Sequence, residues 1–145
     1  MSGKIYDADH RMEEIFQHVV SEKKLINEET TSIDLFDIDF FKARLQSLKA
    51  AFPEEFFLHA QALKGNSFRD VLRITLDNGF GGECASMPEA LYALSVGFPS
   101  DKVVFDSPCK TRADIKTAIE TGIIMNLDNE HEAEVVDELH TVLLD

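Results

Sequence analysis

The chain has 145 residues, of which 44% are hydrophobic, and carries a formal net charge of −13 from 27 acidic and 14 basic side chains. This length and hydrophobic content favour one ordinary folded domain over a disordered chain. The negative charge argues against nucleic acid or an anionic membrane as a partner, because both are bound by basic faces.

The first thirty or so residues predict a leading helix followed by a linker. Met12, Phe16 and either Val19 or Val20 recur at helical spacing in the segment HRMEEIFQHVVSEKKL. The start of the chain lacks the apolar core of a signal peptide and is too acidic for a typical transit peptide. These features make a cytoplasmic location the expectation.

From residue 33 onward, short apolar segments alternate with amphipathic helical segments. Ile33–Phe36 predicts a strand, and the helical segment after it is stopped by Pro53. The pattern then repeats. The next strands are expected to end, 22, 21 and 21 residues apart, at Ala62, Cys84, Phe105 and Asn126. Such regular alternation indicates parallel strands joined by helical crossovers.

Polar residues at the expected starts of the helices support these boundaries. Ser86 with Glu89, and Thr111 with Asp114, match the capping-box pattern, in which a hydroxyl and a carboxylate satisfy free backbone amides. Asn66 or Ser67 is expected to cap the helix after the second strand.

The repeat therefore predicts an α/β fold with parallel strands, compatible with a doubly wound sheet or a barrel. No G-x-G-x-x-G follows the first strand, and the near-constant unit length favours a barrel. A closed barrel of this type takes eight strands and about 250 residues. We expect residues 1–32 to form the leading helix and linker, and residues 33–145 to form about five βα units of a partial TIM-type barrel.

With these elements placed, the chain resembles the pyridoxal-phosphate-dependent decarboxylases related to diaminopimelate, ornithine and arginine decarboxylase, which share an alanine-racemase-like barrel. QALKGN is similar to the family's cofactor-lysine motif, Tyr-Ala-Val-Lys-Ala-Asn. GGECASMPEALYALSVGFP, DKVVFDSPCKTRADIKTAIETGI and IMNLDNEHEAEVV resemble the units that follow, in the family's order. The match runs from about Ile33 to Leu139, and VFDSPCKTR and MNLDN look closer to the diaminopimelate type.

The resemblance implies site residues and a cofactor, pyridoxal 5′-phosphate. Lys64 would be the catalytic residue whose amine forms a Schiff base with the cofactor aldehyde, although a lysine after a strand is more often simply solvated. Glu83 would be a cofactor-binding acid beside that lysine; a solvated or structural salt bridge is the alternative. Gln61 stands where the family has an aromatic residue, and Gly65 where it has alanine. The acidic segment from residue 128 has no metal-ligand spacing, so no metal is expected and a solvated helix face is preferred.

The resemblance implies an amino-acid decarboxylase of amino-acid metabolism, in the lysine or polyamine pathways, acting on a small amino-acid substrate. The family's phosphate loop has no counterpart here, because DNGFGGE leads into a strand at the end of the barrel opposite Lys64. We therefore expect an amino-terminal barrel fragment that is inactive alone and associates as a homo-oligomer or through open sheet edges. The alternatives are a non-catalytic interaction module derived from the family and a complete small protein of unrelated function.

Overall fold

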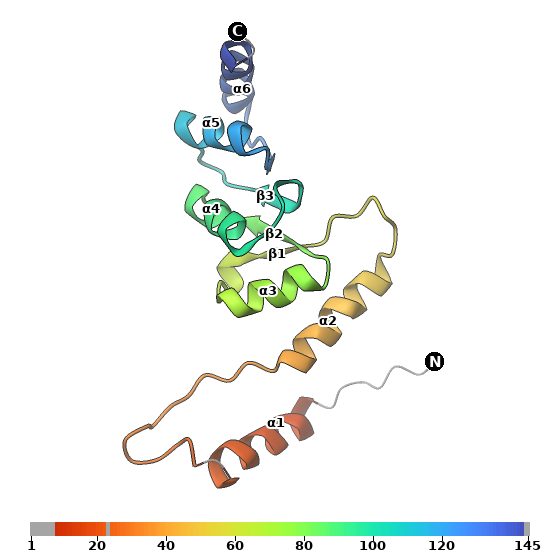
Figure 1. The fold of residues 1–145 in the computed structure, drawn as a ribbon, viewed down its shortest axis with the longest axis vertical. Helices are drawn as coiled ribbons and strands as arrows, with labels where there is room; N and C mark the ends of the chain where they lie inside the picture. The colour runs from red at the N-terminus through yellow and green to blue at the C-terminus, as the bar shows by residue number, and fades with distance from the viewer. Residues whose placement is uncertain (1–7, 23, 144–145) are drawn as a thin grey trace. The chain divides into compact units, whose positions relative to one another are not determined.

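The computed structural model describes the backbone of residues 8–22 and 24–143, and the side chains of residues 10–22 and 24–139. The chain divides into two compact units, Met1–Asp37 and Ile38–Asp145 (Figure 1). In the first unit, α1 (Ala8–Gln17) continues into a π-helical turn, η1 (His18–Glu22), where Val19 is buried. The expectation of a leading helix is met by these elements.

The predicted strand at Ile33–Phe36 is wrong, because the segment forms neither helix nor strand. Leu35 and Phe36 remain about half exposed, so the apolar run packs into no sheet. The residue that follows, Asp37, accepts hydrogen bonds from the Arg11 guanidinium, with 2.7 Å between Nη2 and Oδ1. An apolar run becomes a strand only when a neighbouring strand pairs with its backbone, and none of the described residues does so here.

The second unit holds a four-stranded, fully parallel sheet in the order β1-β2-β3-β4. Four strands therefore replace the five that the sequence predicted, and each is followed by a helix. The α/β class with parallel strands is confirmed. In chain order, the elements are α2 (Ile38–Ala51), β1 (Ala60–Ala62), η2 (Leu63–Gly65), α3 (Arg69–Asp77), β2 (Gly81–Cys84), α4 (Met87–Val96), η3 (Ser100–Lys102), β3 (Val103–Phe105), α5 (Arg112–Thr121), β4 (Ile124–Met125) and α6 (Glu130–Leu143).

The predicted capping box forms in full at α5 and in half at α4, where the Glu89 carboxylate accepts from the amide of Ala85 and not from that of Ser86. Ser86 Oγ accepts from the Glu89 amide, and Thr111 forms a reciprocal box with Asp114. The predicted cap of α3 is wrong: Phe68 is the N-cap residue and makes no side-chain bond. The Asn66 side chain instead accepts from the Phe68 amide at 3.0 Å and closes a turn just before the helix.

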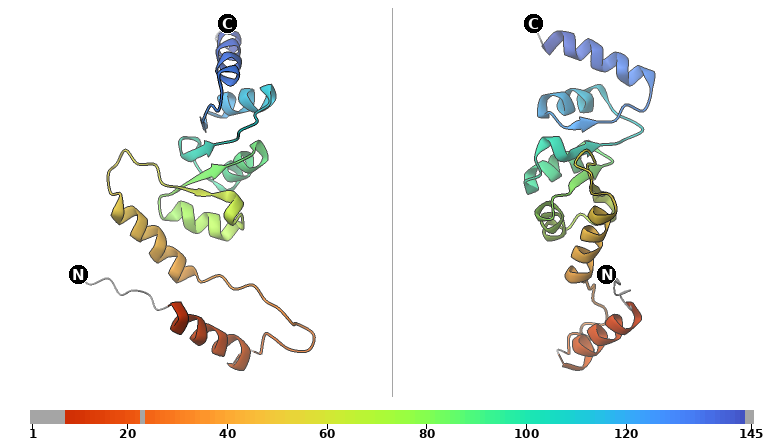
Figure 2. Two further views of the ribbon diagram at one scale, coloured as in Figure 1. Left: turned by 180° about the vertical axis from the view of Figure 1, so that it is seen from behind. Right: turned by 90° about the vertical axis from the view of Figure 1, so that its right-hand side faces the viewer.

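One face of the sheet is covered by helices and the other carries none of α3, α4 or α5 (Figure 2). Val103 and Phe105 of β3 are fully buried on the helix-covered face, and Val104 between them points the opposite way. The core on the helix-covered face is mostly apolar, with the buried Thr75 of α3 as a polar member. Its buried apolar members are Leu63, Leu72, Cys84, Met87, Ala90, Ala93, Val96, Phe98, Val103, Phe105, Ala118 and Ile123. The described helices include none long and apolar enough to cross a membrane.

We expect Gly122→Ala to lower the free energy of unfolding by about 1–2 kcal/mol, the cost of placing a Cβ in left-handed backbone. Gly122 ends α5 with φ of 70°, and the nearest atom to an added Cβ is 3.8 Å away, so the effect is one of backbone conformation alone. Gly65→Ala is the matched control. Its backbone is not left-handed and an added Cβ meets nothing within 4 Å, so a gain of about 0.4–1 kcal/mol is expected. Equal effects of the two changes in urea denaturation would contradict this interpretation.

Candidate functional site

The carboxyl ends of the parallel strands meet at one edge of the sheet, and Lys64 lies at that edge. It occupies the 3-10 turn η2, which directly follows β1. The preceding Leu63 is completely buried in the core, so the start of the turn is fixed. The Lys64 side chain is exposed, and its amine makes no hydrogen bond or ion pair with the part of the chain that the structure describes. The amine is therefore available to react with a molecule from solution.

Glu83 lies on the neighbouring strand, on the face that the helices leave free. Its Cα is paired in register with Ala62 of β1 and with Val104 of β3. Paired residues of a parallel sheet point to the same side, so a carboxylate lies beside a short alanine side chain. Glu83 is half-buried. It forms no ion pair with Lys64 among the described residues, which leaves space at this edge rather than a closed salt bridge.

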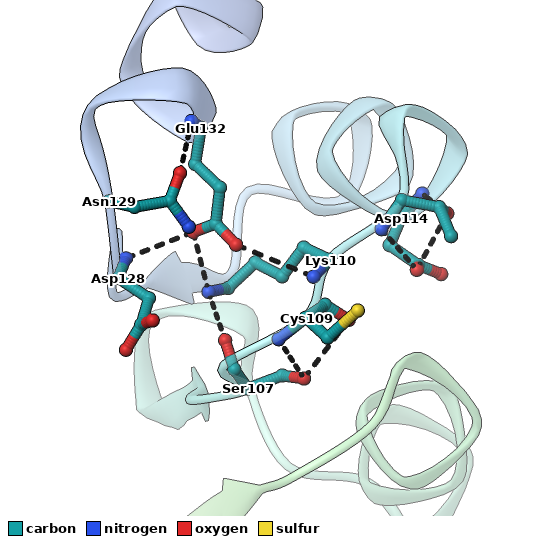
Figure 3. A network of polar contacts seen from close by, with 8 residues as sticks. Ser107, Cys109, Lys110, Asp114, Asp128, Asn129 and Glu132 are labelled. Atoms are coloured by element: carbon teal, nitrogen blue, oxygen red, sulfur yellow. Dashed lines mark hydrogen bonds and ion pairs between the residues drawn. The ribbon is translucent and has the colours of Figure 1, made fainter.

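A buried charged network occupies the same edge one strand further along (Figure 3). Lys110 Nζ lies 2.9 Å from Glu132 Oε2, and the two side chains are 0% and 4% exposed. The amine also donates to the Ser107 carbonyl at 2.5 Å and lies 5.6 Å above the centre of the Phe105 ring. The pair joins the loop after β3 to the first turn of α6. Lys110 is thus fully engaged and, unlike Lys64, has no free amine to offer.

Glu132 is held as a carboxylate by the donors around it. Burial by itself raises the pKa of Glu132, but hydrogen bonds from the Asp128 amide, the Lys110 ammonium and the Lys110 amide outweigh burial and keep this pKa below its usual range. Because the pKa of Glu132 is lower in the folded state than in the unfolded state, the ionised Glu132 contributes fully to stability at a pH above the ordinary glutamate pKa. It is lost as the pH falls through the lower pKa of the folded state.

The helices that start at this edge after β2, β3 and β4 each have one amide of the first turn capped by a side chain. The carboxylates of Glu89 and Asp114 accept from the amides of Ala85 and Thr111, each at the start of its own helix. At α6, the Asn129 side chain accepts from the Glu132 amide at 3.0 Å. A phosphate at the start of α4 or α5 would lie beside the carboxylate of Glu89 or Asp114, and like charges repel each other.

The edge therefore suits one end of pyridoxal phosphate better than the other. An exposed amine beside a carboxylate and short side chains fits the aldehyde end of the cofactor. The phosphate end would meet a carboxylate already bound at the start of α4 or of α5. The glycine-rich segment 77–83 runs from the end of α3 into β2, at the opposite end of the sheet from Lys64, as the sequence predicted.

Other chemistries find little support at this edge. Burial, with a smaller effect from the charges of Glu89 and Glu83, raises the pKa of the Cys84 thiol to about 12. A thiol that stays protonated is a poor nucleophile. Among the described side chains, no group of three or more histidine, cysteine or acidic residues could hold a metal ion.

The structure brings the two site residues predicted from the sequence, Lys64 and Glu83, to one edge of the sheet. The Lys110–Glu132 pair was not predicted. Glu132 belongs to the acidic segment that was expected to be a solvated helix face, and the structure corrects this, because Glu132 is 3% exposed. The one signal in the sequence was the position of Lys110 in the loop after a predicted strand, which is similar to the position of Lys64. Neither lysine's environment follows from spacing alone, since a partner 22 residues away decides it.

Comparison with protein families places the chain among known proteins. Residues 38–142 match the model of the pyridoxal binding domain of pyridoxal-dependent decarboxylases. Diaminopimelate decarboxylase from Campylobacter jejuni is 34% identical over 76% of this chain and 28% of its own length. Antizyme inhibitor 2 from Xenopus laevis is 32% identical over 97% of this chain and 32% of its own length. The chain thus spans about three tenths of these relatives.

Solved structures agree in fold. Diaminopimelate decarboxylase from Helicobacter pylori, complexed with L-lysine, superposes with a TM-score of 0.71 at 26% identity, over 91% of this chain and 31% of that protein. Lysine/ornithine decarboxylase from Vibrio vulnificus, complexed with putrescine, gives a TM-score of 0.64 at 26% identity, over 84% and 32%. The prediction of a partial barrel is confirmed by these neighbours.

We expect Glu132→Gln to lower the free energy of unfolding by about 3 kcal/mol or more at pH 7, because it leaves the Lys110 ammonium buried without a counter-charge. The double variant Lys110→Met/Glu132→Gln should recover most of this loss, since no buried charge remains and the glutamine oxygen still accepts a hydrogen bond from a backbone amide. Denaturant melts of the three proteins measure both effects. If the double variant were as unstable as the single one, the pair would not be an ionic contact in solution.

Proposed function

The chain belongs to the pyridoxal-dependent decarboxylase family, and on this premise we propose that it forms the amino-terminal part of the cofactor-binding barrel of an amino-acid decarboxylase. The observation that carries the proposal is the position of Lys64: an exposed amine at the carboxyl edge of a parallel sheet. Barrel enzymes gather their reactive groups at this edge. Lys64 would be the point of covalent attachment of pyridoxal phosphate. A cytoplasmic location remains part of the same proposal.

In this proposal three residues of the chain have different roles at the aldehyde end of the cofactor. Lys64 supplies the nucleophilic amine, which reacts in its neutral form. Glu83 supplies a negative charge on the adjacent strand and would stabilise positive charge on the nitrogen after attachment. Ala62 leaves the cofactor room to approach both. The cofactor itself supplies the electron sink that permits loss of carbon dioxide from an amino acid.

The names of the relatives support a substrate class. They describe decarboxylases of diaminopimelate, ornithine and lysine, and two neighbours were solved with L-lysine or putrescine. We propose a diamino acid as the substrate of the complete enzyme. The 145 residues alone should not release carbon dioxide, because the glycine-rich segment 77–83 lies at the end of the sheet opposite Lys64, and carboxylates occupy the starts of α4 and α5.

If the barrel is not closed, we expect the chain to associate with further polypeptide. Within the described sheet, β1 and β4 are the outer strands and each pairs on one side only. Ile124 of β4 and Leu127 just after it are 40% and 45% exposed. We propose that these edges take up further strands, either from the rest of a complete barrel or from a second copy of the chain.

We expect added pyridoxal phosphate to produce a new absorbance band near the visible edge with the unchanged chain, and Lys64→Ala to abolish it. Lys116→Ala is the control, because Lys116 is an exposed lysine on α5, with its side chain 52% accessible. An absorbance titration of all three proteins with pyridoxal phosphate measures the intensity of this band. The proposal fails if Lys64→Ala keeps the band at full intensity.

A second function is favoured by the antizyme inhibitor relative, which is similar over 97% of this chain. We propose binding of antizyme as the alternative, with the chain acting as a non-catalytic interaction module. Binding should then survive Lys64→Ala, since no covalent cofactor is needed. Titration calorimetry with purified antizyme measures this; absence of binding at micromolar concentrations would remove the alternative.

A further inference from the structure

The turn that carries Lys64 is fixed at both ends. Leu63 anchors its beginning in the core, where the side chain is completely buried. Gln61 anchors its end: the side-chain nitrogen Nε2 donates to the backbone carbonyl of Asn66 at 3.3 Å. Lys64 lies between these two anchors, and Gly65 after it has open space around it.

Gln61 is itself held by the helix that follows the turn. Its side-chain oxygen accepts a hydrogen bond from the hydroxyl of Thr75, which is completely buried in α3. The orientation of the amide is set by its two partners. The Asn66 carbonyl can only accept, so it must face the NH₂ group, and the oxygen is left for the Thr75 hydroxyl. One side chain therefore connects β1, the Lys64 turn and α3.

The position of Gln61 in the sheet explains how one residue can do this. Gln61 pairs in register with Gly82 and points to the helix-covered face, while Ala60 and Ala62 point to the free face. It thus reaches the backbone of the turn from the helix-covered face, while the Lys64 side chain stays exposed.

We propose that Gln61 is a positioning residue for Lys64: its amide fixes the turn in the conformation that presents the amine at the sheet edge. The inference rests on the proposed role of Lys64 and adds a residue that makes no contact with the cofactor. A fixed turn loses less conformational entropy when a ligand attaches, so it binds more tightly than a mobile one.

Gln61→Met is the direct test, because it keeps the length of the side chain and removes both polar contacts. It strands no buried group, since the Thr75 hydroxyl also lies 3.0 Å from the Val71 carbonyl. We expect faster amide hydrogen exchange in peptides covering residues 63–68, and an apparent Kd for pyridoxal phosphate that rises about three- to tenfold, the effect of one hydrogen bond. The thermal midpoint should change little. Thr121→Val is the matched control: it removes a part-buried hydroxyl, bonded to Thr117, at the far end of α5.

A second pair of variants separates positioning from general stability. Thr75→Ser keeps the hydroxyl and opens a small cavity, so it should lower stability and leave the cofactor affinity unchanged. Thr75→Val keeps the volume and loses the hydroxyl, so it should weaken the affinity as Gln61→Met does. If affinity follows the thermal midpoint across all variants instead, the role of Gln61 is merely structural and the inference is overturned.

If the proposed role of Lys64 is wrong, the experiments give a result different from the one expected when only the inference about Gln61 is wrong. If the unchanged chain shows no band with pyridoxal phosphate, the role of Lys64 fails. Hydrogen exchange then still decides whether Gln61 holds the turn. If the band forms equally well in Gln61→Met, and residues 63–68 exchange at the same rate as in the unchanged chain, Lys64 keeps its role and the inference about Gln61 is wrong.

Discussion

The parallel, in-register pairing of four short strands is the constraint on which the rest of the structure depends. It brings the residues that follow each strand to a single edge, and it sends alternate side chains to opposite faces. Buried apolar residues then take the helix-covered face and leave Glu83 on the other. Lys64, Glu83 and the Lys110–Glu132 pair occur near one edge for this reason, although they come from four different segments of sequence.

The two lysines at this edge show how environment separates residues that the sequence makes look alike. Each directly follows a strand or the short loop after one. Lys110 is buried against a carboxylate, a carbonyl and an aromatic ring. Lys64 has a solvated side chain on a turn that Gln61 holds through a hydrogen bond to the Asn66 carbonyl. The first arrangement stabilises the join between the loop after β3 and α6, and the second leaves an amine free to react.

Sequence periodicity predicted the features that depend on local chemistry. The caps at Ser86 and Thr111 and the spacing of the strand ends follow from neighbours a few residues apart, and the structure confirms them. Features that depend on distant partners were missed. Ile33–Phe36 has the composition of a strand but no strand to pair with, and Glu132 lies in an acidic segment but is buried by Lys110. The contact between Gln61 and Thr75, 14 residues apart, belongs to the same class.

The central claim, that Lys64 is the amine presented for the cofactor, is tested most directly by locating the attachment site. The chain is incubated with a limiting amount of pyridoxal phosphate, reduced with borohydride to fix any adduct, digested and mapped by mass spectrometry. The account predicts that the label lies predominantly on the peptide containing Lys64 and that Lys110 is unlabelled. Labelling spread over the exposed lysines in proportion to their accessibility, with no preference for Lys64, would contradict it.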